Sequence, residues 1–218
     1  MRRFTAAALH LDEHCISTNK GASLADGRER EVMWTGIGGQ GVQLAATILA
    51  QAATLEGLEV MSLGTYGGTM RGGNTDATVV IANRVITSPP IVPRAWAAVV
   101  AHPRFFDPIG PKLRPDGIVV VNSEILEKPL DVRTGQLLEV KATTLAREAD
   151  APNAAALVLL AAFAKATGIV SQASLAEALA KSLPAYRSQF LESNRRALAA
   201  GTDAVPALSS PAWAKEAA

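Results

Sequence analysis

Residues 32–41 read VMWTGIGGQG, and this stretch decides the fold. Its first half, Val32–Gly36, is a short apolar run that ends in glycine, which predicts a buried strand. The next segment, Val42–Leu55, is rich in Ala, Leu and Ile and predicts a helix, with Gly57 placed to end it. A second strand is expected at Glu59–Leu63. Strand, helix and strand in this order form a β–α–β unit, which predicts a parallel sheet.

Turn residues divide the middle of the chain into further strands. A hairpin is expected, formed by Asp76–Ala82 and Val85–Thr87 around the turn Asn83-Arg84. Pro103–Leu113 is expected to be a short helix or a loop, and Pro115-Asp116-Gly117 a turn. The remaining predicted strands are Ala97–Ala101, Ile118–Val121 and Leu137–Lys141.

The C-terminal third is predicted to be helical. Pro152 suits the first turn of a helix that runs to Ala166 and ends at Gly168. Two more helices are expected at Ser174–Leu183 and Tyr186–Ala200, the second ended by Gly201. Strands that alternate with helices define an α/β fold. We expect three layers: a mostly parallel sheet with helices on both faces, together with the hairpin and the C-terminal helices.

The domain is predicted to span residues 31–201. Residues 1–30 read as a polar N-terminal extension, for which a flexible tail is favoured and an arm that wraps a partner subunit is the alternative. His10, His14 and Cys15 lie in it, and three such residues in a polar tail are weak evidence for a metal site, so none is predicted. Residues 202–218 are expected to form an extended C-terminal tail.

Composition limits the possible functions. The chain has 218 residues, 49% of them hydrophobic, and a formal net charge of +1. This suits one compact domain and disfavours a nucleic-acid surface. The single cysteine cannot hold an iron–sulfur cluster, which needs about four ligands. The longest apolar run, Ala154–Ala164, is too short to span a membrane. We expect a cytoplasmic protein without a membrane span.

The first glycine loop matches the pattern G-x-G-x-x-G at Gly36, Gly38 and Gly41, between a predicted strand and a predicted helix. Such loops let a phosphate approach the free N–H groups of a helix start. Tight packing of the helix on the sheet would explain the same glycines equally well. A dinucleotide is disfavoured because the second strand ends in Ser62–Tyr66, which lacks the acid that binds ribose hydroxyls.

The second glycine loop, residues 64–74, reads GTYGGTMRGGN. A loop at the carboxyl end of a parallel strand lies where open α/β sheets bind ligands. Arg71 suits a phosphate or a carboxylate, and Tyr66 could stack on a ring. A binding or docking surface is favoured over a solvated connector.

The chain shows no Ser–His–Asp pattern, metal-ligand spacing or P-loop lysine. His102 is expected to be a polar group at the sheet edge rather than a catalytic base, so no catalytic residue is predicted.

These motifs together resemble a known family. Gly36-x-Gly38-Gly39-Gln40-Gly41-Val42, Tyr66-Gly67 and Arg71-Gly72-Gly73 are similar to the gamma subunit or gamma domain of 2-oxoacid:acceptor oxidoreductases, and the likeness runs from about Glu31 to Ala200. The family includes enzymes that act on pyruvate, 2-oxoglutarate, branched-chain 2-oxoacids, indolepyruvate and phenylglyoxylate. One departure is Gly68-Thr69, where many relatives have Pro-Glu.

The resemblance implies a role and a set of partners. Thiamine diphosphate and iron–sulfur clusters belong to other subunits (alpha, beta, and a delta or a flavin- or NAD-linked subunit), and ferredoxin or a pyridine nucleotide accepts the electrons. The gamma subunit implied for this chain is non-catalytic and helps to bind or enclose coenzyme A, the acyl acceptor. The residues expected at that site are Gly38, Gly39, Gln40, Gly41, Tyr66, Arg71, Gly72, Gly73 and Asn153. The alternatives are a stand-alone regulatory module that binds coenzyme A or a nucleotide, and a purely structural scaffold.

Overall fold

The computed structural model describes residues 29–67, 72–87, 89–132, 136–206 and 211–213. One six-stranded sheet has the order β2-β3-β1-β4-β5-β6. The strands are β1 (Glu29–Ile37), β2 (Glu59–Tyr66), β3 (Asn74–Ala82), β4 (Ala95–Val100), β5 (Leu113–Asn122) and β6 (Gln136–Val140). The α-helices are α1 (Val42–Leu55), α2 (Ala142–Glu148), α3 (Ala155–Thr167), α4 (Gln172–Ser182) and α5 (Leu191–Asp203). The 3-10 helices are η1 (Pro103–Phe105), η2 (Gly110–Lys112), η3 (Ser123–Ile125) and η4 (Ala185–Phe190).

The sheet is mostly parallel, with β3 running against the other strands. β1, β4, β5 and β6 pair side by side in parallel, whereas β3 pairs antiparallel with both β1 and β2. The expected unit β1–α1–β2 exists, but β2 does not lie beside β1 because β3 is inserted between them. β3 is buried over most of its length and suits an interior position, while Ser62–Thr65 of β2 are exposed and suit an edge.

The predicted hairpin within residues 76–87 is wrong. Residues 83–87 form no strand, and Val85 is 71% exposed. The antiparallel partner of β3 is instead β2, in an unbroken register from Glu59↔Ala82 to Tyr66↔Thr75. The second glycine loop connects these two strands. A longer ladder with β2 outcompetes the short one that Val85–Thr87 could form, because each added residue contributes backbone hydrogen bonds and cross-strand contacts.

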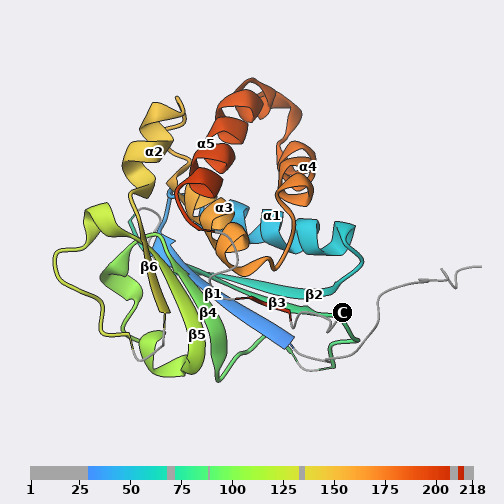
Figure 1. Ribbon diagram of the computed structural model, residues 1–218, viewed down its shortest axis with the longest axis vertical. Helices are drawn as coiled ribbons and strands as arrows, with labels where there is room; N and C mark the ends of the chain where they lie inside the picture. The colour runs from blue at the N-terminus through green and yellow to red at the C-terminus, as the bar shows by residue number, and fades with distance from the viewer. Residues whose placement is uncertain (1–28, 68–71, 88, 133–135, 207–210, 214–218) are drawn as a thin grey trace, which may run out of the picture.

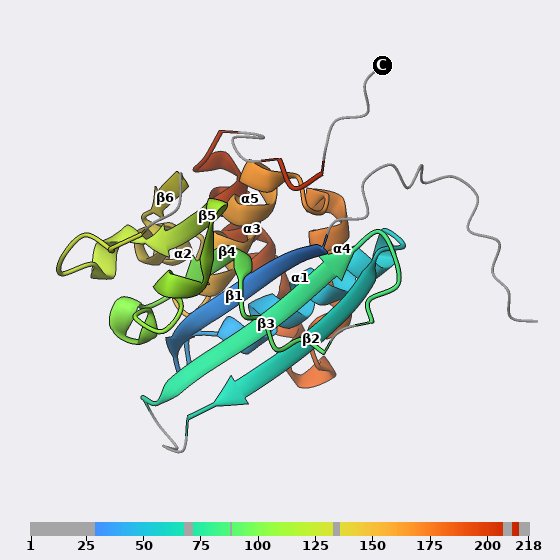
Figure 2. The same ribbon diagram turned by 90° about the horizontal axis from the view of Figure 1, so that it is seen from below.

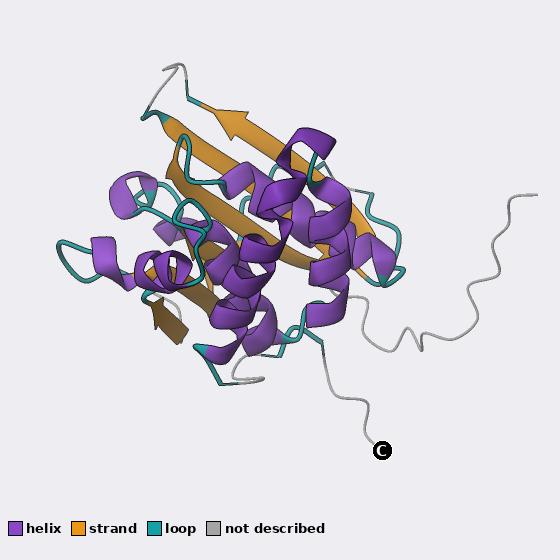
Figure 3. Cartoon of the chain, turned by 90° about the horizontal axis from the view of Figure 1, so that it is seen from above, coloured by secondary structure: helices purple, strands orange, loops and turns teal. Residues whose placement is uncertain are grey.

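The α/β class is confirmed, and the helices are distributed differently from expectation. The helices α1 to α5 of the described residues lie together on one face of the sheet (Figures 1 and 3). In the view from the opposite side, the strands lie in front and the helices lie behind them (Figure 2). On that side, Phe106 and Ile109, in the segment between η1 and η2, pack against β4 and β5. Three prolines within residues 103–111 keep this connection from forming a regular α-helix.

Several predicted boundaries are confirmed and others move. α1 ends before Gly57 and α3 ends at Gly168, whose φ is 61°. α3 begins at Ala155, so Pro152 and Asn153 lie in the loop before it. The predicted turn at residues 115–117 lies within β5, where the register with β4 shifts. The backbone of Gly117 lies so close to that of Trp96 that a side chain would not fit.

The prediction that Gly201 ends the last helix is wrong. α5 continues through Gly201 to Asp203, and η4 precedes it where one long helix was expected. Gly201 lies directly against the backbone of Val158 in α3, and a β-carbon there would overlap with the Val158 carbonyl group. The glycine therefore permits the close crossing of two helices.

The predictions for residues 1–28, for Arg71, for the Tyr66 side chain and for parts of the C-terminal tail lie outside the described residues.

Candidate ligand-binding cleft

Three glycines of the first loop, Gly36, Gly39 and Gly41, are required by the structure. Gly39 has φ 100° and Gly41 has φ 78°, and residues with a side chain are strained at such positive φ angles. A β-carbon on Gly36 would lie 2.7 Å from Val42 Cγ2, so this glycine permits close packing of α1. The Gln40 side chain turns back on its own loop, where its Oε1 accepts a hydrogen bond from Ile37 N at 2.8 Å. Gln40 thus holds the loop in shape.

The two glycine loops meet through their backbones. Gly38 N of the first loop donates to Gly73 O of the second at 3.0 Å. Within the second loop, Gly67 N donates to Asn74 O at 2.7 Å. Gly72 has φ 70° and open space around its α-carbon. Tyr66 is the last residue of β2, opposite Thr75. The carboxyl ends of β1 and β2 therefore carry one connected glycine-rich surface, as the position of the loops predicted.

A cleft of about 540 Å³ opens beside the first glycine loop. It lies between the start of α1, residues 150–157, and a third wall formed by η4 with the first turn of α5. A β-carbon on Gly41 would lie 3.8 Å from Asn153 O, so the loop and the segment before α3 are in close contact. Among the predicted site residues, the cleft brings together Gly39, Gly41 and Asn153. Its full lining is Gly39, Gly41, Leu44, Asp150, Ala151, Pro152, Asn153, Ala154, Ala156, Leu157, Leu183, Arg187, Phe190, Ser193 and Asn194.

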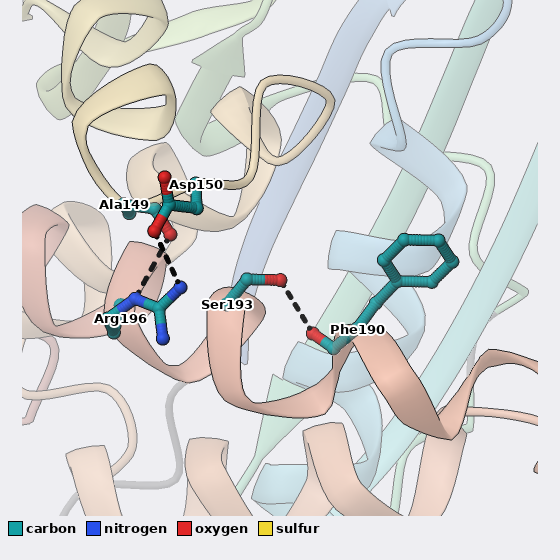
Figure 4. A network of polar contacts seen from close by, with 5 residues as sticks. All are labelled: Ala149, Asp150, Phe190, Ser193 and Arg196. Carbon is teal, nitrogen blue, oxygen red and sulfur yellow. Dashed lines mark hydrogen bonds and ion pairs between the residues drawn. The ribbon is translucent and has the colours of Figure 1, made fainter.

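Polar contacts fix the wall of the cleft that α5 provides (Figure 4). Arg196 donates from Nη2 to Asp150 Oδ2 at 3.0 Å and from Nε to Ala149 O at 3.2 Å. Asp150 is the one non-glycine residue with positive φ, at 55°, in the described part of the chain. The hydroxyl of Ser193 donates to Phe190 O at 3.1 Å and is engaged within its own helix turn. The two hydrogen bonds of Arg196 therefore tie the segment before α3 to α5.

The electrostatics of the cleft favour an anion. α1 begins at Val42, its N-cap residue Gly41 offers no side-chain cap, and its first turn contains no acid, so the positive end of the helix is not offset by a carboxylate of that turn. Gly41 and Leu44, at this end of α1, line the cleft. Arg187 lines the opposite side, with its guanidinium 5.5 Å from the centre of the Tyr186 ring. Over the ranges that the structure describes, Arg187 forms no ion pair, whereas the carboxylate of Asp150 is held by Arg196. Phe190, half exposed, adds an aromatic surface.

Sequence reasoning missed the third wall of the cleft. Arg187 and Phe190 lie about 150 residues from the glycine loop, and only the tertiary fold brings them to it. A weak local signal existed, since Tyr186, Arg187 and Phe190 place two aromatic rings and a cation in an otherwise polar segment. Gly38, Gln40, Gly72 and Gly73, which were also expected to contact the ligand, are not among the residues that line this cleft.

A larger cavity, of about 810 Å³, lies at the carboxyl ends of β4 and β5 and contains no glycine-loop residue. His102 is at its edge, where its Nδ1 accepts a hydrogen bond from Arg104 N at 3.2 Å. Burial, with a smaller effect from the Arg104 charge, lowers the pKa of His102 below 6.5. Cationic and acidic side chains share the rim, Arg104 and Lys128 against Asp107, Glu127 and Asp131, so this cavity has no clear charge preference.

The strand order around the first glycine loop differs from that of the dinucleotide-binding fold. In that fold the acid that binds ribose stands at the end of the strand beside β1. Here the neighbour of β1 on that side is β3, which runs antiparallel and begins at this edge.

The described residues contain no group of three or more His, Cys, Asp or Glu side chains suited to a metal ion. None of their helices has the length and apolar character to cross a membrane.

Comparison with known proteins identifies the family. Residues 31–204 match the pyruvate ferredoxin/flavodoxin oxidoreductase family, and the chain belongs to it. It is 36% identical to the pyruvate/ketoisovalerate oxidoreductases common subunit gamma of Pyrococcus furiosus, over 77% of this chain and 92% of that one. It is 29% identical to the 2-oxoglutarate synthase subunit KorC of Methanocaldococcus jannaschii, over 71% of this chain and 84% of that one.

Solved structures share the fold. The gamma subunit of a keto/oxoacid ferredoxin oxidoreductase from Geobacter sulfurreducens superposes with a TM-score of 0.68 at 25% identity, covering 80% of this chain and 96% of that one. A 2-oxoglutarate:ferredoxin oxidoreductase from Magnetococcus marinus gives a TM-score of 0.72 at 17% identity. In that case 84% of this chain matches 32% of the other, so the same fold also occurs as one part of a longer chain.

Proposed function

We propose that the chain is the gamma subunit of a cytoplasmic, multi-subunit 2-oxoacid oxidoreductase, and that its cleft binds the phosphates of coenzyme A. Family membership and the gamma-subunit names of its relatives support the first part. The observation that carries the second is that an uncapped α1 N-terminus and Arg187, which forms no ion pair with the described residues, stand across one cleft.

Coenzyme A fits this cleft chemically. It carries a pyrophosphate and a 3′-phosphate, which suit helix N–H groups and a guanidinium. Its adenine ring suits an exposed aromatic side chain such as Phe190. The volume of about 540 Å³ is within the range of small-molecule sites, so it would hold part of the cofactor and leave the thiol end free to reach a neighbouring subunit.

The chemistry itself is assigned to partner subunits. Thiamine diphosphate, the iron–sulfur clusters and the transfer of electrons to ferredoxin or a pyridine nucleotide belong there under this proposal. Two polar side chains of the cleft already have partners within the chain: the Asp150 carboxylate is paired with Arg196, and the Ser193 hydroxyl donates to Phe190 O. Because these groups are engaged, we assign the cleft a binding role rather than a role in proton transfer. Gly38, Gln40 and Gly73 hold the two loops in shape through their hydrogen bonds, and Gly72 stays a predicted contact of the second loop. Arg71 and Tyr66 stay predicted contacts from the second loop.

Co-purification tests the subunit assignment. An affinity-tagged chain expressed from its native locus should bring down subunits that carry thiamine diphosphate and iron–sulfur clusters, and the isolated chain should show no oxidoreductase activity. A chain that elutes without partners from native extract, and that binds coenzyme A with micromolar affinity on its own, would instead establish the stand-alone regulatory module.

A further inference from the structure

Among the residues that the structure describes, no strand lies beside the outer edge of β2. This strand is first in the strand order of the described sheet, so one side of its eight-residue backbone has no neighbouring strand. Unpaired edges attract other strands, and natural proteins block them with lysine, proline or bulges. β2 contains none of these, and its register with β3 is regular over its whole length. Its exposed backbone therefore has the geometry to accept a further strand.

The side chains of β2 give this edge an apolar strip. Gly64 contacts Gln43 of α1, so residues 60, 62 and 64 face the helices, and Met61, Leu63 and Thr65 face the other side of the sheet. Met61 packs against the small cluster of Val80, Ala82 and Ile86 there. Leu63 is 43% exposed. Figure 2 shows β2 on this side of the sheet without a covering helix.

The opposite edge of the sheet is different. β6 has five residues, includes Glu139 within its ladder and is followed at once by Lys141. Its length limits the number of hydrogen bonds that an added strand could make. Leu137 is 37% exposed, close to the value for Leu63, which makes the two edges a matched pair for experiment.

We propose that β2 pairs antiparallel with β2 of a second copy of this chain, which joins two sheets into one across a twofold axis. In such a twofold contact, the β2 edge of each copy is covered by the β2 strand of the other. Its charge pattern permits self-pairing: Glu59 is the only charged residue of β2 and lies at its first position, so the twofold axis puts the two Glu59 side chains at opposite ends. Met61 and Leu63 of both copies then form one continuous apolar strip.

The oligomeric mass of the full chain tests this proposal, which does not rest on coenzyme A binding. Light scattering over a dilution series should give twice 22.7 kDa for the wild type at high concentration. Leu63→Lys should give 22.7 kDa throughout, while the control Leu137→Lys on β6 should behave as wild type. A wild-type chain that is monomeric at every concentration, or a dimer that survives Leu63→Lys but not Leu137→Lys, overturns the proposal.

Hydrogen exchange locates the contact without any substitution. Amide protons in peptides that cover residues 59–65 should exchange faster when the wild type is diluted from dimer to monomer, and those of β6 should not change. Circular dichroism shows whether Leu63→Lys keeps its fold, and Leu63→Ser serves as the second variant if it does not. Dilution that leaves exchange at residues 59–65 unchanged contradicts the proposal, whatever the mass.

Discussion

Gly201 of α5 lies so close to Val158 of α3 that their backbones are in contact across the helix crossing. This relationship reverses the usual effect of a glycine in a helix. Replacing an interior glycine by alanine normally stabilises a helix by about 1 kcal/mol. Here a β-carbon would overlap with the Val158 carbonyl group and push the two helices apart. Overpacking of this kind costs roughly 1–3 kcal/mol.

Gly201→Ala is therefore expected to lower the free energy of unfolding, as measured by urea denaturation. The control is Ala199→Gly, at an exposed position two residues earlier in α5, which should cost about 1 kcal/mol through helix propensity alone. A stabilised Gly201→Ala protein would mean that α3 and α5 do not cross as described.

Asp150 is expected to tolerate glycine better than alanine. Its φ of 55° is a conformation in which an ordinary L-residue is strained by roughly 1–2 kcal/mol and glycine is not. Its ion pair with Arg196 is largely exposed and contributes at most about 1 kcal/mol. Asp150→Gly should thus leave thermal stability close to wild type, and Asp150→Ala should lower it. Equal melting temperatures for the two variants would argue against the strained backbone.

Glu124 should make stability depend on pH in the acid range. Burial acts to raise its pKa, but hydrogen bonds from the Thr144 hydroxyl and N–H, another from the N–H of Thr143 and the charge of Arg147 together hold the pKa below 4.5. A carboxylate with a lowered folded pKa stabilises the fold above its unfolded pKa, and this contribution is lost as the pH falls through the folded value.

Glu124→Gln should accordingly reduce stability at neutral pH and flatten the pH dependence below 4.5, as followed by urea denaturation across that window. Thr144→Val removes one of the donors and should produce a smaller change of the same sign. If Glu124→Gln unfolds with the same acid dependence as wild type, these hydrogen bonds do not lower the pKa of Glu124.

Local patterns predicted β1, the glycine loop and α1, because the apolar run, the helix composition and Gly57 all lie within one continuous segment. The position of β2 could not be predicted, since the insertion of β3 beside β1 depends on pairing between distant segments. Gly201 fits a helix end and a helix crossing equally well in sequence. Asn153 was placed near the loop through family resemblance, whereas Arg187 lies on a wall that exists only in the folded chain.

The coenzyme A dependence of the assembled enzyme tests the central claim most directly. Arg187→Ala should raise the KM for coenzyme A roughly tenfold, the lower end of what a charge-assisted hydrogen bond contributes, and leave kcat and the KM for the 2-oxo acid unchanged. The matched control is Arg195→Ala, since Arg195 lies on α5 outside the cleft and pairs with Glu192. An unchanged KM for coenzyme A in Arg187→Ala, or an equal rise in both variants, would contradict the assignment of this cleft to coenzyme A.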